Sequence, residues 1–326
     1  MTTLITGGTG FVGLALAEAL LRRGEGVVLM GISPAPSQLI DRAELASLAT
    51  VIGDVTDPAA VRDIIAGHGV SRLVHAAAVT PNAEREQREA ARIINVNAGG
   101  TAQVVGEALR HSQVARIIVL SSVAIYGFAP PGPQGDYDER LSHPAPSSLY
   151  GISKLAAEQT ALRLAELAGR DVQIVRLGPV FGPWEHATGL RDNLSPHCQV
   201  LAAAQAGREV VLPRPMAADW IYSRDAAAVL AALTLQPRSR EAVCNLGGGR
   251  TSDLPAWCQA IERHDPSLRW RVAGPGEEPT ITYTLPQDRA PLAIGRIRAE
   301  IGGFAPRTLV EAAADTVAFL AEQDHP

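Results

Sequence analysis

A glycine-rich turn near the N-terminus constrains the fold of this chain more than any other stretch. An apolar run over residues 3–6 leads into Gly7-Gly8-Thr9-Gly10, and an apolar-periodic segment over residues 11–23 follows at once. This order predicts a strand, a tight loop and a helix, whose N-terminal N–H groups and dipole suit a phosphate group. Glycine is required because a Cβ in the loop would hold a pyrophosphate away. Two spacings of dinucleotide-binding turns are present, G-x-G-x-x-G over Gly8, Gly10 and Gly13 and G-x-x-G-x-x-G over Gly7, Gly10 and Gly13.

Strand and helix patterns alternate after this turn. We expect strands at residues 3–6, 26–30, 49–52, 73–76, 117–120 and 172–177, and helices at 11–23, 58–66, 86–111 and 148–168. Residues 117–120 are uniformly apolar, as expected for a strand that is buried on both faces. The alternation predicts an α/β protein with a Rossmann-type doubly wound parallel sheet.

The pattern loosens beyond Gly178. We expect helices near residues 193–206, 225–235, 254–262, 291–301 and 308–322, with short strands at 210–212, 220–222, 242–246 and 268–272. The sequence therefore predicts two domains. Residues 1–177 form the dinucleotide-binding domain, and residues 178–326 form mainly a smaller α/β substrate lobe with some segments returning to the first domain.

Charge and composition exclude several classes of function. The chain has 34 acidic and 29 basic residues and no dense Lys/Arg cluster, which argues against a nucleic-acid partner. No run approaches the roughly 18 apolar residues of a membrane span, and the first strand begins too early to leave room for a signal peptide. The three cysteines lie far apart, and no metal-binding motif is present. We expect a soluble, cytoplasmic protein without a metal.

A tyrosine and a lysine four residues apart form the second signal. Tyr150 and Lys154 fall in the expected helix 148–168, where this spacing places both side chains on one face. A nearby cation lowers the pKa of a phenol, which is ordinarily about 10. The pair is therefore suited to move a hydroxyl proton during hydride transfer.

Two further features point to the same edge of the sheet. Ser122 lies just after the expected strand 117–120, and ligands of open α/β sheets bind beyond the carboxyl ends of the strands. Its hydroxyl group could hydrogen-bond a reacting alcohol or ketone, or it could simply cap the end of the strand. The proline- and glycine-rich residues 127–146 form a loop longer than the connection needs, which is typical of a segment lying over a site.

Together the glycine turn, Asp54, Asn97, Ser122, Tyr150 and Lys154 resemble the extended short-chain dehydrogenase/reductases, the NAD-dependent epimerase/dehydratase group. The resemblance implies that Tyr150 is the acid/base, that Lys154 binds the nicotinamide ribose and lowers the Tyr150 pKa, and that Ser122 orients the substrate oxygen. It implies that Asn97 supports the Tyr/Lys helix, and that His75 is structural. The residues implied to lie at the cofactor are Gly7, Gly10, Phe11, Val12, Gly13, Ser33, Asp54, Val55, Ala76, Ala77, Ala78, Asn97, Tyr150, Lys154 and Pro179.

Departures from the family pattern bear on specificity. The second strand ends in Gly31-Ile32-Ser33, without the acidic residue that usually binds the adenosine ribose or a basic residue for a 2′-phosphate. We therefore expect NAD and leave NADP open. Val123 and Ala124 stand where the sugar-nucleotide dehydratases carry an Asp-Glu pair, so the resemblance argues against dehydration. Pro179 and Ala218 replace an asparagine and an arginine that help to hold nucleotide-sugar substrates.

These departures favour one activity and leave two alternatives. We expect an NAD(P)-dependent dehydrogenase or epimerase for a secondary alcohol of a sugar, sugar acid or polyol, with Ser122, Tyr150, Arg191, Asn193 and Arg289 at the substrate. The first alternative is a nucleotide-sugar 4-epimerase that holds its diphosphate through Asn193, Arg191 and Arg289. The second is a non-catalytic regulator that senses the dinucleotide. The resemblance also implies a homodimer formed through the helices expected at 86–111 and 148–168.

Overall fold

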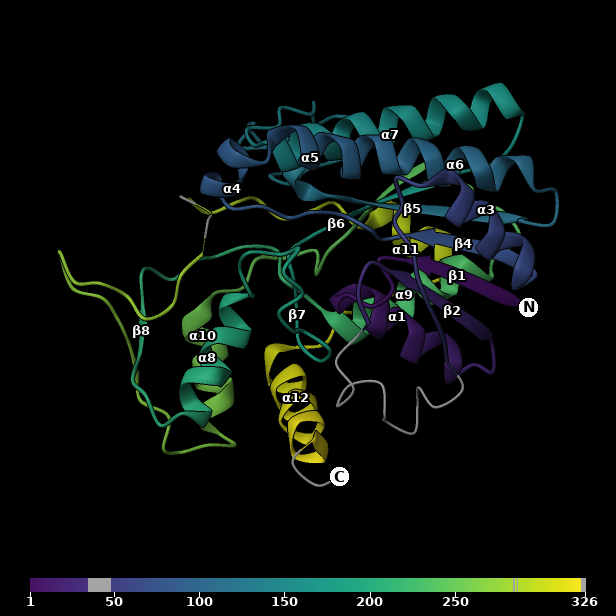
Figure 1. Ribbon diagram of the computed structural model, residues 1–326. Coiled ribbons are helices and arrows are strands. Elements are labelled where there is room, and N and C mark those ends of the chain that lie inside the picture. The colour runs from purple at the N-terminus through teal and green to yellow at the C-terminus, as the bar shows by residue number, and fades with distance from the viewer. Residues whose placement is uncertain (35–47, 284, 286, 324–326) are drawn as a thin grey trace.

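The central element is a seven-stranded parallel sheet with the strand order β10-β6-β5-β4-β1-β2-β3 (Figure 1). The structure is a computed structural model that describes residues 1–34, 48–283, 285 and 287–323. Its strands are β1 (Thr2–Thr6), β2 (Gly26–Gly31), β3 (Ala49–Ile52), β4 (Val70–His75), β5 (Arg116–Ser122), β6 (Gln173–Leu177) and β10 (Val243–Leu246). All neighbours in this sheet pair in parallel, as the alternating pattern predicts, so their carboxyl ends lie along one edge.

Helices cover both faces of the sheet (Figure 1). One face packs against α1 (Phe11–Leu21), α9 (Ser223–Leu235) and α11 (Gly295–Ile301). The other packs against α3 (Pro58–Gly67), α6 (Gly100–Arg110) and α7 (Leu149–Ala168). Successive residues of β5 contribute to opposite faces, with Ile118 in one apolar cluster and Ile117 in the other. The doubly wound parallel fold predicted from the sequence is confirmed.

Local sequence explains where the helices begin. Asp57 accepts hydrogen bonds from the N–H groups of Ala59 and Ala60, and a proline occupies the first helical position of α3. Ser148 caps α7 by accepting the Gly151 N–H at 3.1 Å. These caps fix the first turn of each helix, and the α7 cap therefore fixes the position of Tyr150.

The single helix predicted over residues 86–111 is wrong in detail. The structure has α4 (Ala83–Arg88), α5 (Ala90–Ile94), a π-turn η2 (Asn95–Gly99) and then α6. The first break falls at Glu89, whose φ of −124° and ψ of 27° are not helical. Asn82 caps α4 by accepting the Arg85 N–H, which moves its start upstream of the expected position. The π-turn inserts one extra residue into the regular pattern of helical hydrogen bonds, as is common next to functional sites.

The remaining C-terminal elements form a third apolar cluster beyond the edge of the sheet. They are β7 (Val180–Phe181), α8 (Pro196–Gln205), β8 (Val210–Leu212), β9 (Ile221–Tyr222), α10 (Leu254–Glu262), β11 (Trp270–Val272) and α12 (Leu309–Gln323). Between them in sequence, α9 packs against α1, and β10 pairs with β6 in the central sheet. The division of the chain at residue 177 stays a prediction. Among the described residues, no helix combines the length and the apolar character that crossing a bilayer requires.

The segment predicted as a helix over residues 291–301 is helical only from Gly295. Its first residues form a bridge with Tyr137 instead, because Tyr137 donates its N–H to the Pro291 carbonyl at 2.8 Å and accepts the Ala293 N–H at 3.0 Å. The Leu292 N–H is taken by the carboxylate of Asp219 at 2.8 Å. Tertiary partners therefore use backbone groups that a helix would have used.

A histidine is buried in the aromatic part of this third cluster. His197 is 1% exposed and stacks on Phe181 with 4.0 Å between ring centroids, beside Trp220 and Trp257. Neither ring nitrogen has a hydrogen-bond partner among the described residues. Burial lowers the pKa of His197 to about 3.

This histidine makes the fold sensitive to acid. Below its ordinary pKa of 6.5 the imidazole is protonated in the unfolded chain, while the buried ring stays neutral until about pH 3. Stability is therefore lost as the pH falls from 6.5 toward 3, by up to about 1.4 kcal/mol per pH unit. His197→Phe should flatten the fall in unfolding free energy between pH 6 and 4, measured by urea denaturation. The exposed His264→Asn should leave it unchanged, and equal slopes for His197→Phe and the parent would contradict this account.

Candidate active site

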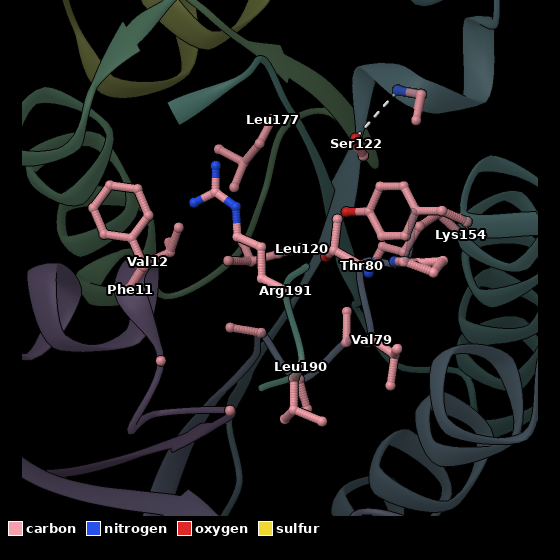
Figure 2. A pocket seen from close by; sticks show the side chains of 18 of the residues that line it. Phe11, Val12, Val79, Thr80, Leu120, Ser122, Lys154, Leu177, Leu190 and Arg191 are labelled. Carbon is pink, nitrogen blue, oxygen red and sulfur yellow. Dashed lines mark hydrogen bonds between the residues drawn. The ribbon is translucent and has the colours of Figure 1, made fainter. Parts of the chain in front are cut away.

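A cleft of about 960 Å³ opens beyond the carboxyl ends of the central strands. Figure 2 shows Phe11 and Val12 on one side of it, Ser122, Thr80 and Lys154 on the other, and Arg191 between them in this view. Of the residues assigned to the site from the sequence, these line the cleft: Gly7, Gly10, Phe11, Val12, Gly13, Ser33, Asp54, Val55, Ala76, Ala77, Ala78, Ser122, Tyr150, Lys154, Pro179, Arg191 and Arg289. Asn97 and Asn193 lie outside the lining.

The glycine turn forms a cradle at the start of α1. Gly7 has a φ of +67°, and a Cβ there would lie 2.6 Å from the Cα of Ala77. A Cβ at Gly13 would lie 2.6 Å from the Cα of Gly8, so the helix packs closely against the turn. The N-cap of α1 is Gly10, which places no capping side chain over the first N–H groups of the helix. Uncapped amides at a helix N-terminus fit the pyrophosphate of a dinucleotide.

The end of β2 explains one departure from the family pattern. A Cβ at Gly31 would meet the Thr9 hydroxyl at 2.2 Å, so the glycine turn itself leaves no space for a larger residue there. Ser33 and Asp54 both line the cleft, as does Gly31. The Asp54 carboxylate also accepts the N–H and the hydroxyl of Thr56, both at 2.8 Å, which holds it in place.

The tyrosine, the lysine and the serine come together in the cleft. Tyr150 and Lys154 lie one turn apart on α7, and Ser122 ends β5. Burial raises the pKa of Tyr150, while hydrogen bonds with Ser122 and Thr80 and the positive charge of Arg191 act to lower it. The resemblance implied that Lys154 lowers this pKa, but the effect of burial dominates and the pKa is raised instead. Burial lowers the pKa of Lys154 to about 8, against the opposing effect of Glu158. Tyr150 is therefore a protonated phenol at neutral pH in this structure, within reach of two hydroxyl groups.

Asn97 does not line the cleft, and its assignment to the cofactor stays a prediction. It is fully buried in η2, accepts the Val79 N–H at 2.8 Å and donates to the Val79 carbonyl at 3.0 Å. Its amide also donates to the Ser153 hydroxyl on α7 at 2.9 Å. Asn97 thus ties the end of β4 to the helix that carries Tyr150 and Lys154. This is the supporting contact that the resemblance implies.

His75 is held in a neutral form under the cleft. Its Nδ1 lies 2.6 Å from the Thr6 hydroxyl, and its Nε2 lies 2.9 Å from the Thr101 hydroxyl. Thr101 donates its own proton to the Asn97 carbonyl at 2.6 Å, so it accepts from Nε2–H, and Nδ1 accepts from Thr6. Burial and the charge of Lys154 lower the pKa of His75 to about 3. This arrangement supports the structural role expected for His75.

A buried ion pair supports Lys154 from the next turn of α7. Glu158 is fully buried and binds the guanidinium of Arg176 on β6 at 2.8 Å, with further contacts at 3.1 and 3.2 Å. It also accepts the hydroxyl proton of Ser121. Arg176 donates to the Tyr126 hydroxyl at 2.8 Å. Because both charges are buried and paired, the network fixes α7 against β5 and β6.

The loop between β7 and α8 brings Arg191 to the cleft. Thr80 donates its N–H to the Leu190 carbonyl at 2.8 Å and accepts the Asp192 N–H at 3.2 Å, which forms a short parallel bridge. Arg191 pairs with the buried Glu185 at 2.9 Å, and its guanidinium carbon lies 5.6 Å from the Phe11 ring centroid. Asn193 follows this bridge, is half-buried and does not line the cleft, so its assignment to the substrate lacks support here.

Sequence reasoning missed several residues of the cleft. Thr80, Phe128 and Tyr283 line it, and Glu185 supports Arg191 from outside the lining. The proline- and glycine-rich loop 127–146 gave the only signal for Phe128. The others come from loops whose approach depends on tertiary contacts such as the Thr80–Arg191 bridge, and no local pattern marks them. The described residues contain no group of three His, Cys, Asp or Glu side chains placed to hold a metal ion.

Known proteins resemble the chain over this same framework. It is 32% identical over 195 residues to the dTDP-glucose 4,6-dehydratase of Streptomyces niveus, a match that covers 57% of this chain and 56% of that protein. It is 27% identical to the dTDP-L-rhamnose 4-epimerase of Burkholderia thailandensis over 80% of both chains. The fold matches the structure of MoeE5 in complex with UDP-glucose and NAD, with a TM-score of 0.77, 23% identity and 99% of each chain covered.

The family model covers the glycine turn, the Tyr/Lys helix and the central sheet through β10. It is the model of the NAD dependent epimerase/dehydratase family, and it matches residues 3–247. The resemblance inferred from the glycine turn, Ser122, Tyr150 and Lys154 is therefore confirmed, and the chain belongs to the NAD-dependent epimerase/dehydratase family.

Proposed function

We propose that the chain is an NAD-dependent oxidoreductase that interconverts a secondary alcohol and a ketone on a sugar, sugar acid or polyol. The observation that carries the proposal is the meeting of Ser122, Tyr150 and Lys154 in one cleft with the glycine cradle. A bound NAD supplies the two-electron acceptor for such an oxidation. Gly7, Gly10 and Gly13 would hold its pyrophosphate, and Asp54 and Lys154 would lie at its two ends.

The side chains divide the proton chemistry among them. When a ketone is reduced, the Tyr150 phenol donates the proton that the new alcohol requires. In the oxidation direction the Tyr150 phenol first gives up its own proton to solvent, which nearby positive charge favours. The phenolate then takes the hydroxyl proton as the alcohol carbon loses a hydride. Ser122 and Thr80 hydrogen-bond the same phenol and would orient the reacting oxygen.

Water elimination is disfavoured despite the similarity to a dehydratase. Val123 and Ala124 line the cleft directly after Ser122, where a dehydratase would need a carboxyl pair to move protons. Neither side chain carries an ionisable group. The position therefore supports a dehydrogenase or an epimerase.

A nucleotide-sugar 4-epimerase is the second candidate. The named relatives and the MoeE5 complex favour it, because their names refer to nucleotide sugars. Arg191 already pairs with Glu185, and Asn193 does not line the cleft, so only Arg289 of the three groups expected to hold a diphosphate both lines the cleft and has no ion pair among the described residues. A dinucleotide-sensing regulator would not need Ser122, Tyr150 and Lys154 together.

An activity assay distinguishes these functions. Purified protein is incubated with NAD and a panel of alditols, aldonates and UDP-sugars. The proposal expects absorbance of reduced nicotinamide to appear with one class of alcohol and the cofactor to be released. NAD that stays bound while a UDP-sugar is epimerised without net reduction would establish the epimerase. Binding of NAD without turnover of any alcohol or UDP-sugar would contradict both enzymes and favour the regulator.

Two properties accompany this proposal as predictions. We expect a homodimer formed through α7 and the α4–α6 segment, where Ile94, Ile152 and Leu167 are exposed. Light scattering at micromolar concentration tests it, and a monomer would contradict it. We also expect the protein to act in the cytoplasm.

A further inference from the structure

Arg289 lines the cleft and forms no ion pair within the described part of the chain. It is half-buried and lines the cleft, and its guanidinium carbon lies 4.8 Å from the Phe128 ring centroid. Among the described residues, no carboxylate forms an ion pair with it, and its buried Nε has no hydrogen-bond partner. Burial lowers the pKa of Arg289, which is the sign of a charge that has lost water without gaining a partner.

Arg191, which lines the same cleft, provides the contrast. Its guanidinium is held at 2.9 Å from Glu185, whose side chain is 1% exposed. Glu185 is itself fixed by the Ser195 N–H at 2.6 Å and the Ser195 hydroxyl at 2.5 Å. The charge of Arg191 is therefore largely balanced within the protein, whereas that of Arg289 is not.

The segment that carries Arg289 is rigidly placed. Three residues further on, Leu292 donates its N–H to Asp219, which also accepts the Gly249 N–H at 3.2 Å. The adjoining residues pair with Tyr137 in the loop that also carries Phe128. The guanidinium and the ring beneath it thus belong to two loops joined by backbone hydrogen bonds, so their geometry exists before any ligand binds.

Tyr283 connects this cation to the reacting centre. It lines the cleft, packs against Trp220 with 5.3 Å between ring centroids, and lies within electrostatic reach of Arg289, Arg191 and Tyr150. Its phenol hydroxyl can donate a hydrogen bond to an oxyanion bound by Arg289. An anion on Arg289 would therefore lie close to a substrate oxygen at Tyr150.

We propose that Arg289, with Tyr283, binds the carboxylate of the substrate, so that the substrate is a hydroxy acid of the sugar-acid class. The inference rests on the proposed function for the alcohol chemistry and adds the anionic group. A guanidinium presents parallel N–H groups that match a carboxylate in a two-point contact. The Phe128 ring, with its centroid 4.8 Å from the guanidinium carbon, contributes a cation–π contact to the same group.

Charge balance favours a carboxylate over a phosphate or a diphosphate. One unbalanced arginine neutralises a single negative charge, whereas a phosphate monoester carries close to two at neutral pH. Arg191 could serve as a second cation only by leaving the buried Glu185, whose charge would then lack its ion-pair partner.

Binding of matched ligands to the NAD-loaded protein tests the inference. Calorimetry gives the affinities for two acids, gluconate and glucuronate, and for their uncharged counterpart glucitol. Glucose 6-phosphate and UDP are measured in the same way. We expect at least one acid to bind 10-fold or more tightly than glucitol, and Arg289→Gln to weaken that acid roughly 10- to 100-fold while leaving glucitol unchanged. Arg289→Lys should keep part of the preference, because it keeps the charge and loses the two-point geometry. Arg271→Gln removes the same charge from the exposed surface and should bind like the parent.

The outcomes separate this inference from the proposed function. Three outcomes would overturn the carboxylate site even if an alcohol is oxidised. They are equal affinities for glucitol and both acids, tightest binding of glucose 6-phosphate or UDP, and an acid preference that Arg289→Gln leaves unchanged. Acid binding that depends on Arg289, without Tyr150-dependent reduction of NAD, would uphold the site and refute the dehydrogenase.

Discussion

Tyr150→Phe should lower kcat by about 10²- to 10⁴-fold while leaving NAD affinity unchanged. The substitution removes one oxygen from a side chain that already lies in the cleft, so the walls of the cofactor site keep their shape. The hydroxyl is the group that hydrogen-bonds Ser122 and Thr80, and its proton is the one that the reaction moves. Steady-state kinetics and NAD titration on the same preparation measure the two effects separately.

Tyr222→Phe is the matched control for this variant. In the parent protein the Tyr222 hydroxyl is also buried and donates a hydrogen bond to Asp315, but the side chain does not line the cleft. It should lose some stability and keep its kcat. Equal kcat for Tyr150→Phe and the parent would remove the proposed chemistry, whereas a parallel loss of NAD binding would show that Tyr150 acts through the fold.

Glu158→Gln should destabilise the fold by about 3–5 kcal/mol, because it leaves the buried charge of Arg176 without its counter-charge. Urea denaturation at pH 7 measures this loss. Glu166→Gln on the same helix removes an exposed partner of Arg163 and should cost at most about 1 kcal/mol. A similar, small loss for both variants would contradict the role assigned to the buried network.

The same variant should change the pH dependence of activity. Lys154 has a pKa lowered to about 8 by burial, and the charge of Glu158 opposes that lowering. As the pH rises through this value Lys154 loses its charge, so activity that requires the ammonium falls above about pH 8. Without the Glu158 charge the fall should begin at lower pH in Glu158→Gln. A profile that coincides with the parent's would show that Lys154 does not titrate in this range.

The parts of the site that the sequence predicted are those that depend on short spacings. The glycine turn is predictable because Gly7 and Gly13 are required by contacts with neighbouring backbone. Tyr150 and Lys154 are predictable because four residues make one helical turn. The central sheet was recognisable for a similar reason, since buried parallel strands are continuously apolar over a few residues.

The rest depends on contacts between distant segments. Arg191 reaches the cleft through its bridge with Thr80, and residues 291–294, just after Arg289, depart from the predicted helix because Tyr137 and Asp219 take their backbone groups. Asn193 follows the same bridge yet lies outside the lining, although the sequence resemblance placed it at the substrate. Residue type alone could not distinguish a paired arginine from an unpaired one, which is the difference that bears on the substrate.

A crystal structure of the protein with NAD tests the central claim most directly. The account predicts the pyrophosphate against the N–H groups of Gly10 to Val12 and the nicotinamide ring beside the Tyr150 hydroxyl, with Lys154 on the attached ribose. A dinucleotide bound elsewhere, or bound with its nicotinamide ring out of reach of Tyr150, would contradict it.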